Sequence, residues 1–321
     1  MKKILIIGSG GQIGSELVKK LRGIYGNENV VASDLRQLTG EIVETGPFER
    51  IDSTSIVQII EVVKKYNIDT IYNLAAILSA TAELNPMLGW NVGIGSLINC
   101  LEIARVFNCA LFTPSSIGAF GPNTPKDLTP QDTIQRPTTI YGITKVTGEM
   151  LSDYYFRRYG VDTRSVRFPG LISNLTLPGG GTTDYAVEIF YSAVKGEKFI
   201  CPLEKGTFMD MMYMPDALDA AINIMEADPT KLIHRNSFNV TAMHFDPEEI
   251  YAEIRKHKPD FKMIYEHDET RQKIVDAYDE LGGELTAHVL VDEGLLKKNE
   301  DAIHCLELED AVADLSIQLS N

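Results

Sequence analysis

The chain of 321 residues has the composition of a folded globular protein and a formal net charge of −15 at pH 7. Its 44% hydrophobic and 23% charged residues are too apolar for a disordered chain. Nucleic acid or an anionic membrane would need clustered Lys and Arg, so neither is expected as a partner.

The four cysteines are scattered along the chain, with no CxxC pair and no His at metal-ligand spacing. We predict that they are reduced core thiols and that the protein has no metal site. The apolar run at residues 4–7 is too short for the core of a signal peptide, and no run reaches the length of a membrane span. These features predict a cytoplasmic protein, with a longer precursor carrying an organellar leader as the alternative.

Short β-type runs alternate with amphipathic helical stretches in the first half of the chain. The expected strand and helix pairs are residues 4–7 and 13–21, 30–32 and 56–65, 70–74 and 97–107, and 110–113 and 141–159, followed by a strand at 163–167. This alternation predicts an α/β fold of Rossmann type, a doubly wound parallel sheet with crossover helices on both faces.

The pattern changes at about Pro169 to a glycine-rich loop, isolated helices and short strands. Helices are expected at 216–226 and 247–257, where Asp216 and Asp246 are suitable caps. We predict an NAD-binding Rossmann domain over residues 1–168 and a smaller substrate-binding lobe over 169–321, with some of the chain crossing back to the sheet. Methionines at 209, 211, 212 and 214 alternate as in a strand and favour packing within this lobe.

A glycine-rich segment lies between the first strand and the first helix. Its glycines let the chain turn and let backbone N–H groups approach a dinucleotide pyrophosphate at the helix N-terminus. A glycine run alone is weak evidence, but its place after a strand and before a helix favours a cofactor loop. The candidate residues are Gly8, Gly11, Gln12, Ile13 and Gly14.

Two acidic residues are candidates for the adenosine end of the cofactor. Asp34 lies twenty residues after Gly14, where a carboxylate can accept hydrogen bonds from ribose hydroxyls and repel a 2′-phosphate. This predicts NAD, although a helix-capping role is the alternative for Asp34 and the nearby Arg36 leaves NADP open. Asp52 is placed for a contact with adenine or for an ordinary turn.

Tyr141 and Lys145 begin a helix and are four residues apart, so they share one face of it. A phenol ordinarily has a pKa of about 10, and a nearby ammonium favours the phenolate. Such a tyrosine can take the proton of an alcohol while a hydride leaves its carbon for a nicotinamide. Ser116 is the better candidate for steering the substrate oxygen, with Ser115 as its neighbour at the end of a strand.

These residues together resemble the extended short-chain dehydrogenase/reductase family, which includes nucleotide-sugar epimerases and dehydratases. Five blocks, at residues 73–80, 113–122, 167–173, 179–185 and 211–214, look like the short-chain-type L-threonine 3-dehydrogenases. The resemblance implies oxidation of the threonine hydroxyl to 2-amino-3-ketobutyrate with reduction of NAD. It places Leu74, Ala75, Ala76 and Leu171 at the cofactor, and it places at the substrate Ser79, Thr182, Thr183 and Asp184.

Physical reasoning favours a small zwitterionic substrate over a nucleotide sugar. The family's epimerases usually place an arginine for the substrate diphosphate before an apolar strand, where this chain has Met209 and Asp210. An acidic residue at that point is unfavourable for a diphosphate. An NAD-dependent epimerase or dehydratase is the first alternative, and an NAD-binding protein with weakened catalysis is the second.

The resemblance also bears on assembly and on the end of the chain. In the family, helices near residues 93–107 and 141–159 pair across a dimer, and the aromatic residues at 154–159 predict a homodimer here. The threonine dehydrogenases continue after residues 272–278 with a Trp-Pro element that covers the substrate pocket. This chain instead has DELGG from Asp279 and no tryptophan beyond Trp90. The acidic stretch at 307–310 predicts a solvated helix face.

Overall fold

The elements of secondary structure follow the alternating order expected from the sequence. The computed structural model describes residues 1–279, apart from 126–128, 174, 176–178, 180, 233, 234 and 241. The strands are β1 (Ile4–Ile7), β2 (Val30–Asp34), β3 (Phe48–Arg50), β4 (Thr70–Asn73), β5 (Ala110–Phe112), β6 (Ser115–Ser116), β7 (Thr163–Arg164), β8 (Val166–Phe168), β9 (Gly170–Ile172), β10 (Phe199–Cys201), β11 (Met209–Tyr213), β12 (Phe238–Asn239), β13 (Met243–Phe245) and β14 (Met263–Tyr265). The helices are α1 (Gln12–Tyr25), α2 (Glu41–Glu44), α3 (Ile56–Tyr66), α4 (Ser79–Leu84), α5 (Pro86–Phe107), α6 (Ile140–Tyr159), α7 (Tyr185–Lys195), α8 (Met214–Glu226), α9 (Pro247–His257) and α10 (Glu269–Asp279).

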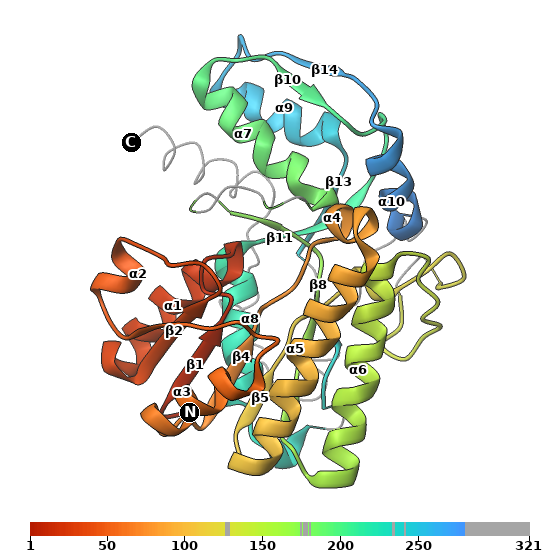
Figure 1. Cartoon of the computed structure of the whole chain (residues 1–321). Helices are drawn as coiled ribbons and strands as arrows, with labels where there is room; N and C mark the ends of the chain where they lie inside the picture. The colour runs from red at the N-terminus through yellow and green to blue at the C-terminus, as the bar shows by residue number, and fades with distance from the viewer. Residues whose placement is uncertain are drawn as a thin grey trace.

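Within the described residues, six parallel strands form the main sheet in the order β3-β2-β1-β4-β5-β7. Successive side chains of a strand point to opposite faces. On β1, Ile4 and Ile6 therefore pack with α1 and α8, whereas Leu5 and Ile7 pack with α3 and α5. Helices cover both faces (Figure 1), so the predicted doubly wound α/β fold is confirmed.

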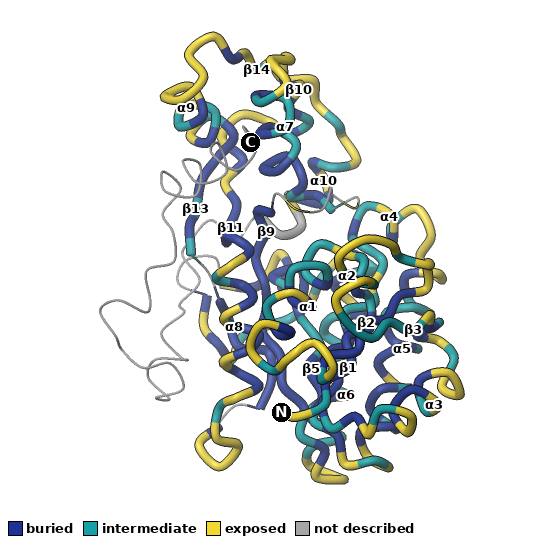
Figure 2. Tube along the Cα trace, turned by 90° about the vertical axis from the view of Figure 1, so that its left-hand side faces the viewer, coloured by how far each residue is buried: buried dark blue, intermediate teal, exposed yellow. Residues whose placement is uncertain are grey.

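A second apolar core lies beyond the carboxyl ends of the main sheet. It is built from α7, α9, β10, β11 and β13 and appears at the top of Figure 1. The paired strands β9 and β11 run between this part and the main sheet, and Figure 2 shows both as largely buried. Helix α8 packs against the main sheet, and the predicted division of the chain at 168/169, with some of the chain crossing back to the sheet, remains a prediction.

Several predicted boundaries were wrong. The strand expected at 163–167 divides into β7 and β8, which belong to different sheets. Helix α8 begins at Met214, so Asp216 lies in its first turn and is not its cap. The boundaries of α9 are as predicted, and Asp246 caps it by accepting a hydrogen bond from the Glu249 amide at 2.9 Å.

Helix α5 begins eleven residues before the predicted position. Contrary to the sequence expectation, it is long and apolar enough to cross a membrane by length and composition alone. Eight of its residues are nevertheless buried, and it packs along α6 and against β4, as a core helix does (Figure 1). The prediction about the acidic stretch at 307–310 and the altered segment after Asp279 lie outside the described residues.

Candidate active site

A cleft of about 550 Å³ opens at the carboxyl ends of β1 and β4. These strands are neighbours in the sheet, and the chain leaves them toward opposite faces, which is where α/β proteins bind ligands. The cleft brings together most of the residues predicted from the sequence. They are Gly8, Gly11, Gln12, Ile13, Gly14, Leu74, Ala76, Ser79, Ser115, Ser116, Tyr141, Lys145, Leu171, Thr182, Thr183 and Asp184.

The glycine loop wraps closely around the start of α1. The Gly8 backbone has a φ of 91°, which favours glycine, and its amide donates to the Ser33 carbonyl at 2.9 Å. A Cβ atom on Gly14 would lie only 2.2 Å from the Gly8 carbonyl oxygen. The side-chain nitrogen of Gln12 is buried and has no hydrogen-bond partner among the described residues. This loop therefore offers helix amides and an unused donor to an anion, and it fits the pyrophosphate of a dinucleotide.

Asp34 lies at the end of β2 and forms an ion pair with the guanidinium of Arg36. Its carboxylate accepts hydrogen bonds from the Gly10 amide at 2.9 Å and from Arg36 Nε at 3.0 Å. Burial would raise the pKa of Asp34, but the hydrogen bonds from Arg36 and Gly10 hold that pKa below its usual value. Arg36 also donates to the Gly10 carbonyl and lines the cleft, whereas Asp34 does not. An ionised carboxylate at this position disfavours a 2′-phosphate.

Two further predicted cofactor residues do not line the main cleft. Asp52 Oδ1 accepts hydrogen bonds from the amide and the hydroxyl of Thr54, at 2.9 and 2.7 Å, so the alternative of a turn residue fits the structure better than a ligand contact. Ala75 lies instead on a smaller cavity beside Lys145.

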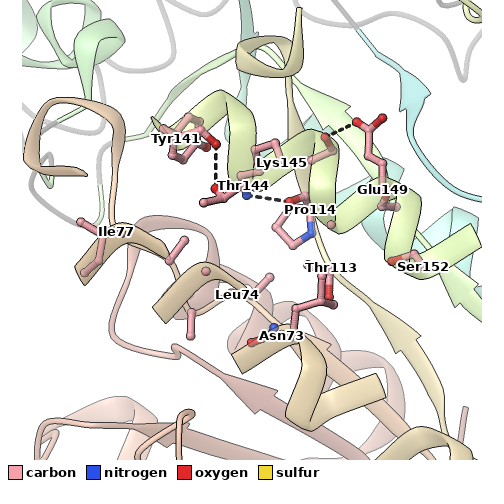
Figure 3. Close-up of a pocket in the computed structure, with 18 residues that line it drawn as sticks. Asn73, Leu74, Ile77, Thr113, Pro114, Tyr141, Thr144, Lys145, Glu149 and Ser152 are labelled. Atoms are coloured by element: carbon pink, nitrogen blue, oxygen red, sulfur yellow. Dashed lines mark hydrogen bonds between the residues drawn. The ribbon is translucent and has the colours of Figure 1, made fainter. Parts of the chain in front are cut away.

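Tyr141 and Lys145 lie in the first turns of α6 and line both the cleft and a smaller cavity, which Figure 3 shows. The helix begins where the Thr139 hydroxyl accepts a hydrogen bond from the Gly142 amide at 3.1 Å. Lys145 Nζ donates to the Pro114 carbonyl at 2.7 Å and lies 5.2 Å from the centre of the Tyr141 ring. The carbonyl of Pro114 thus holds the Lys145 ammonium over the Tyr141 ring.

The two serines of β6 have different surroundings. The Ser115 hydroxyl donates to Glu149 and is buried, although Ser115 touches the cleft wall. Ser116 Oγ accepts a hydrogen bond from the Gly118 amide at 3.1 Å, which leaves its own O–H to donate. The structure therefore favours Ser116 over Ser115 as the donor to a substrate oxygen.

A cavity of about 40 Å³ lies behind Lys145 (Figure 3). Asn73 Oδ1 and Thr113 Oγ1 line it and are buried without hydrogen-bond partners among the described residues. The space is large enough for a water molecule, and these two oxygens would be hydrogen-bond partners for it.

Hydroxyl groups line the part of the cleft that is formed by α4 and the turn before α7. Ser79 and Thr81 come from α4, and Thr182 and Thr183 from the turn before α7. Asp184 also lines the cleft, but its carboxylate accepts the Gly181 amide at 2.7 Å and so shapes this turn.

Sequence reasoning missed several residues of the site. Thr81 belongs to α4, a helix whose sequence shows no strong hydrophobic periodicity. Segment 168–170 also lines the cleft, because β8 and β9 pass its edge. The carboxylate of Glu149 accepts a hydrogen bond from Ser115. Glu149 lies four residues after Lys145 on the same helix face, and this spacing could have predicted its place near the site.

Asp210 requires a correction. The sequence predicted that its carboxylate lies where a nucleotide-sugar diphosphate would bind, but Asp210 is absent from the residues that line the cleft. It is buried on β11, 3.2 Å from Nδ1 of His244 on β13. That prediction was wrong, because the Asp210 side chain faces the neighbouring strand. In the described part of the chain, no group of three or more His, Cys, Asp or Glu residues gathers that could hold a metal ion.

The geometry agrees with the comparison to protein families. Residues 4–240 match the NAD dependent epimerase/dehydratase family. The chain belongs to this family. NAD is accordingly its cofactor, and the glycine loop, the Gln12 amide and Asp34 with Arg36 are the groups that fit it.

Members of the family similar to this chain include both uncharacterized and structurally known proteins. An uncharacterized epimerase/dehydratase of Staphylococcus haemolyticus is 55% identical over 87% of this chain and 88% of its own. The structure of L-threonine dehydrogenase from Clostridium difficile is 51% identical, with a TM-score of 0.93 over 100% of this chain and 98% of its own. The holo form of a GalE-like L-threonine dehydrogenase from Cupriavidus necator is 43% identical, with a TM-score of 0.89 over 99% of each chain. The resemblance to threonine dehydrogenases seen in the sequence is confirmed by these structures.

Proposed function

We propose that this protein is an L-threonine 3-dehydrogenase, which oxidises the 3-hydroxyl of L-threonine to give 2-amino-3-ketobutyrate and NADH. The observation that carries the proposal is the chemistry of the substrate end of the cleft. At this end, formed by α4 and the turn before α7, the described lining consists of hydroxyls, the Asp184 carboxylate, backbone and apolar groups, while the cleft-lining cations, Arg36 and Lys145, lie at the cofactor loop and beside Tyr141. A diphosphate would require positive charge at the substrate end, whereas a small zwitterion needs hydrogen-bonding groups.

The likeness to threonine dehydrogenases supports the same substrate. It extends over the full length of this chain at 51% identity for the protein from Clostridium difficile.

The proposed chemistry uses three side chains of the cleft. Ser116 donates its hydroxyl hydrogen to the substrate oxygen and orients the alcohol toward Tyr141. The Tyr141 phenolate takes the proton of that hydroxyl, while the ammonium of Lys145 stabilises the negative charge on the phenol oxygen. Bound NAD supplies the acceptor for the hydride that leaves the same carbon. Alcohol and NAD are thereby converted to ketone, NADH and one proton.

The test is formation of NADH from L-threonine, with L-serine and 3-hydroxybutyrate as competing substrates. We expect L-threonine to be the best of the three. Tyr141→Phe should lower turnover by at least about 100-fold, because it removes the base, while NAD still binds. The substrate assignment would be wrong if another small alcohol were oxidised and threonine were not. Retained turnover in Tyr141→Phe would contradict the role of the phenol.

A nucleotide-sugar epimerase or dehydratase is the second candidate, because the buried position of Asp210 removes one argument against it. Thermal stabilisation by UDP-sugars but not by threonine would favour this alternative. Tight NAD binding without oxidation of any hydroxy-amino acid would instead favour a protein with weakened catalysis.

We also propose that the protein is a homodimer in the cytoplasm. Helices α5 and α6 pack side by side (Figure 1), and their outer surfaces expose large apolar side chains. Exposed apolar side chains on two adjacent helices favour pairing with a second copy. The exposed residues are Met87, Leu88, Ile98, Val106, Ile143, Met150, Tyr154 and Tyr159.

A further inference from the structure

Glu149 lies on α6, one turn after Lys145, and is buried with an exposed fraction of 7%. Both of its carboxylate oxygens bond to the guanidinium of Arg167, at 3.0 Å from Nε and 2.8 Å from Nη2. The Ser115 hydroxyl donates to one oxygen and Gln135 Nε2 to the other, at 2.8 Å. The carboxylate is therefore held in one orientation by four hydrogen bonds from three segments of the chain.

Arg167 is equally fixed. Its Nη1 donates to the Gln131 carbonyl at 3.0 Å and to the side chain of Asn239 at 2.9 Å. The exposed fraction of Arg167 is 5%, and its guanidinium lies 5.2 Å from the centre of the Phe120 ring. Because the planar guanidinium of Arg167 is hydrogen-bonded on both sides, Glu149 has little freedom to shift.

Each of the three segments that meet at this ion pair contributes residues to the lining of the cleft. Helix α6 carries Tyr141 and Lys145, and β6 carries the two serines, while β8 leads into cleft residues 168–171. Strands β6 and β8 pair with Ser115 opposite Arg167. Because neighbouring side chains of a strand point to opposite sides, anchoring Ser115 on Glu149 directs Ser116 toward the cleft.

A buried ion pair is weak evidence for a stabilising role. The cost of removing both charges from water offsets most of their attraction, and apolar replacements are often as stable. Such pairs are better suited to fixing one arrangement among several. We propose that Glu149, held by Arg167, is a positioning residue: through the Ser115 hydroxyl it fixes β6 against α6 and so holds Ser116 at the oxygen on which Tyr141 acts. This inference rests on the proposed chemistry of Ser116 and Tyr141.

The primary test is Ser115→Ala, which removes the link and leaves the ion pair intact. Thr163→Val is the matched control, because it removes a buried hydroxyl that donates to the Ser152 carbonyl at 3.0 Å and does not line the cleft. We expect Ser115→Ala to lower kcat by at least about 10-fold, equivalent to the loss of one hydrogen bond to a charged group, with the Kd of NAD unchanged. The control should leave both quantities at their wild-type values.

A double-mutant cycle separates positioning from general damage to the fold. Glu149→Gln should lower kcat at least as much as Ser115→Ala, and the two changes together should cost little more than Glu149→Gln alone. Independent, multiplicative effects would overturn the proposal. If Glu149→Gln fails to fold because Arg167 is left unpaired, Glu149→Gln with Arg167→Met removes both charges and takes its place in the cycle.

The cycle is measured with whichever small alcohol the wild-type protein oxidises. Its outcome therefore tests the role of Glu149 even if threonine is not the substrate. A second readout needs no substrate. In the NAD-loaded protein, Ser115→Ala and Glu149→Gln should each accelerate amide hydrogen exchange at residues 115–118, and Thr163→Val should not. Wild-type exchange there in both variants would overturn the proposal, whether or not threonine is oxidised.

Discussion

Replacing Gly14 by alanine should damage both the fold and NAD binding, although alanine is the better helix former. Gly14 lies in the first turn of α1, where alanine would ordinarily stabilise a helix by up to about 1 kcal/mol. The added Cβ would, however, lie 2.2 Å from the Gly8 carbonyl oxygen and 2.8 Å from the Ser9 Cα. Both obstacles are backbone atoms, so the loop must move by about 1 Å, and such overpacking costs about 1–3 kcal/mol.

Gly23 provides the matched control on the same helix. A Cβ built on it meets no atom within 4 Å, and the residue is exposed. Gly23→Ala should therefore raise the free energy of unfolding by up to about 1 kcal/mol, whereas Gly14→Ala should lower it by about 1–2 kcal/mol. Urea unfolding of the two variants and of the wild type measures this difference in sign.

The same displacement should weaken NAD binding. Moving the loop by this distance breaks at least one hydrogen bond from a backbone amide to a charged phosphate, which is worth about 1.5–3 kcal/mol. The Kd of NAD should therefore rise about 10-fold to 150-fold in Gly14→Ala, measured by calorimetry, and should not change in Gly23→Ala. The steric reasoning would be refuted if Gly14→Ala bound NAD as the wild type does and matched Gly23→Ala in stability.

Three other predictions concern the cofactor, the thiols and assembly. Asp34→Asn removes the charge that opposes a 2′-phosphate, so the preference for NAD over NADP should fall at least about 10-fold in parallel calorimetric titrations, and an unchanged ratio would contradict this role. Burial raises the pKa of Cys100 to about 12 and the pKa values of Cys109 and Cys201 to about 11. Little thiolate therefore forms at about pH 8, and iodoacetamide should label these thiols only after unfolding. Labelling of the native protein, detected by mass spectrometry, would contradict this prediction. Met150→Asp on the outer face of α6 should convert a dimer to monomers in sedimentation experiments, and a wild-type monomer would disprove the proposed pairing.

The sequence by itself determined the features that depend on neighbours along the chain. The apolar run of β1 followed by the glycine loop, and the four-residue spacing of Tyr141 and Lys145, are local patterns with local geometric consequences. Helix α9 was predicted to the residue because its Asp246 cap forms within one turn. The order of strands and helices then predicted the parallel sheet and the edge at which the cleft opens.

Only the tertiary structure decided which way individual polar side chains point. Ser115 and Ser116 are adjacent, and their roles separate because β6 pairs with β8 and Glu149 lies on one side of it. Asp210 faces β13 and not the cleft, and this orientation follows from pairing with a strand more than thirty residues away. A strand's sequence fixes the alternation of its side chains but not which face meets the substrate, because that choice depends on register with distant strands.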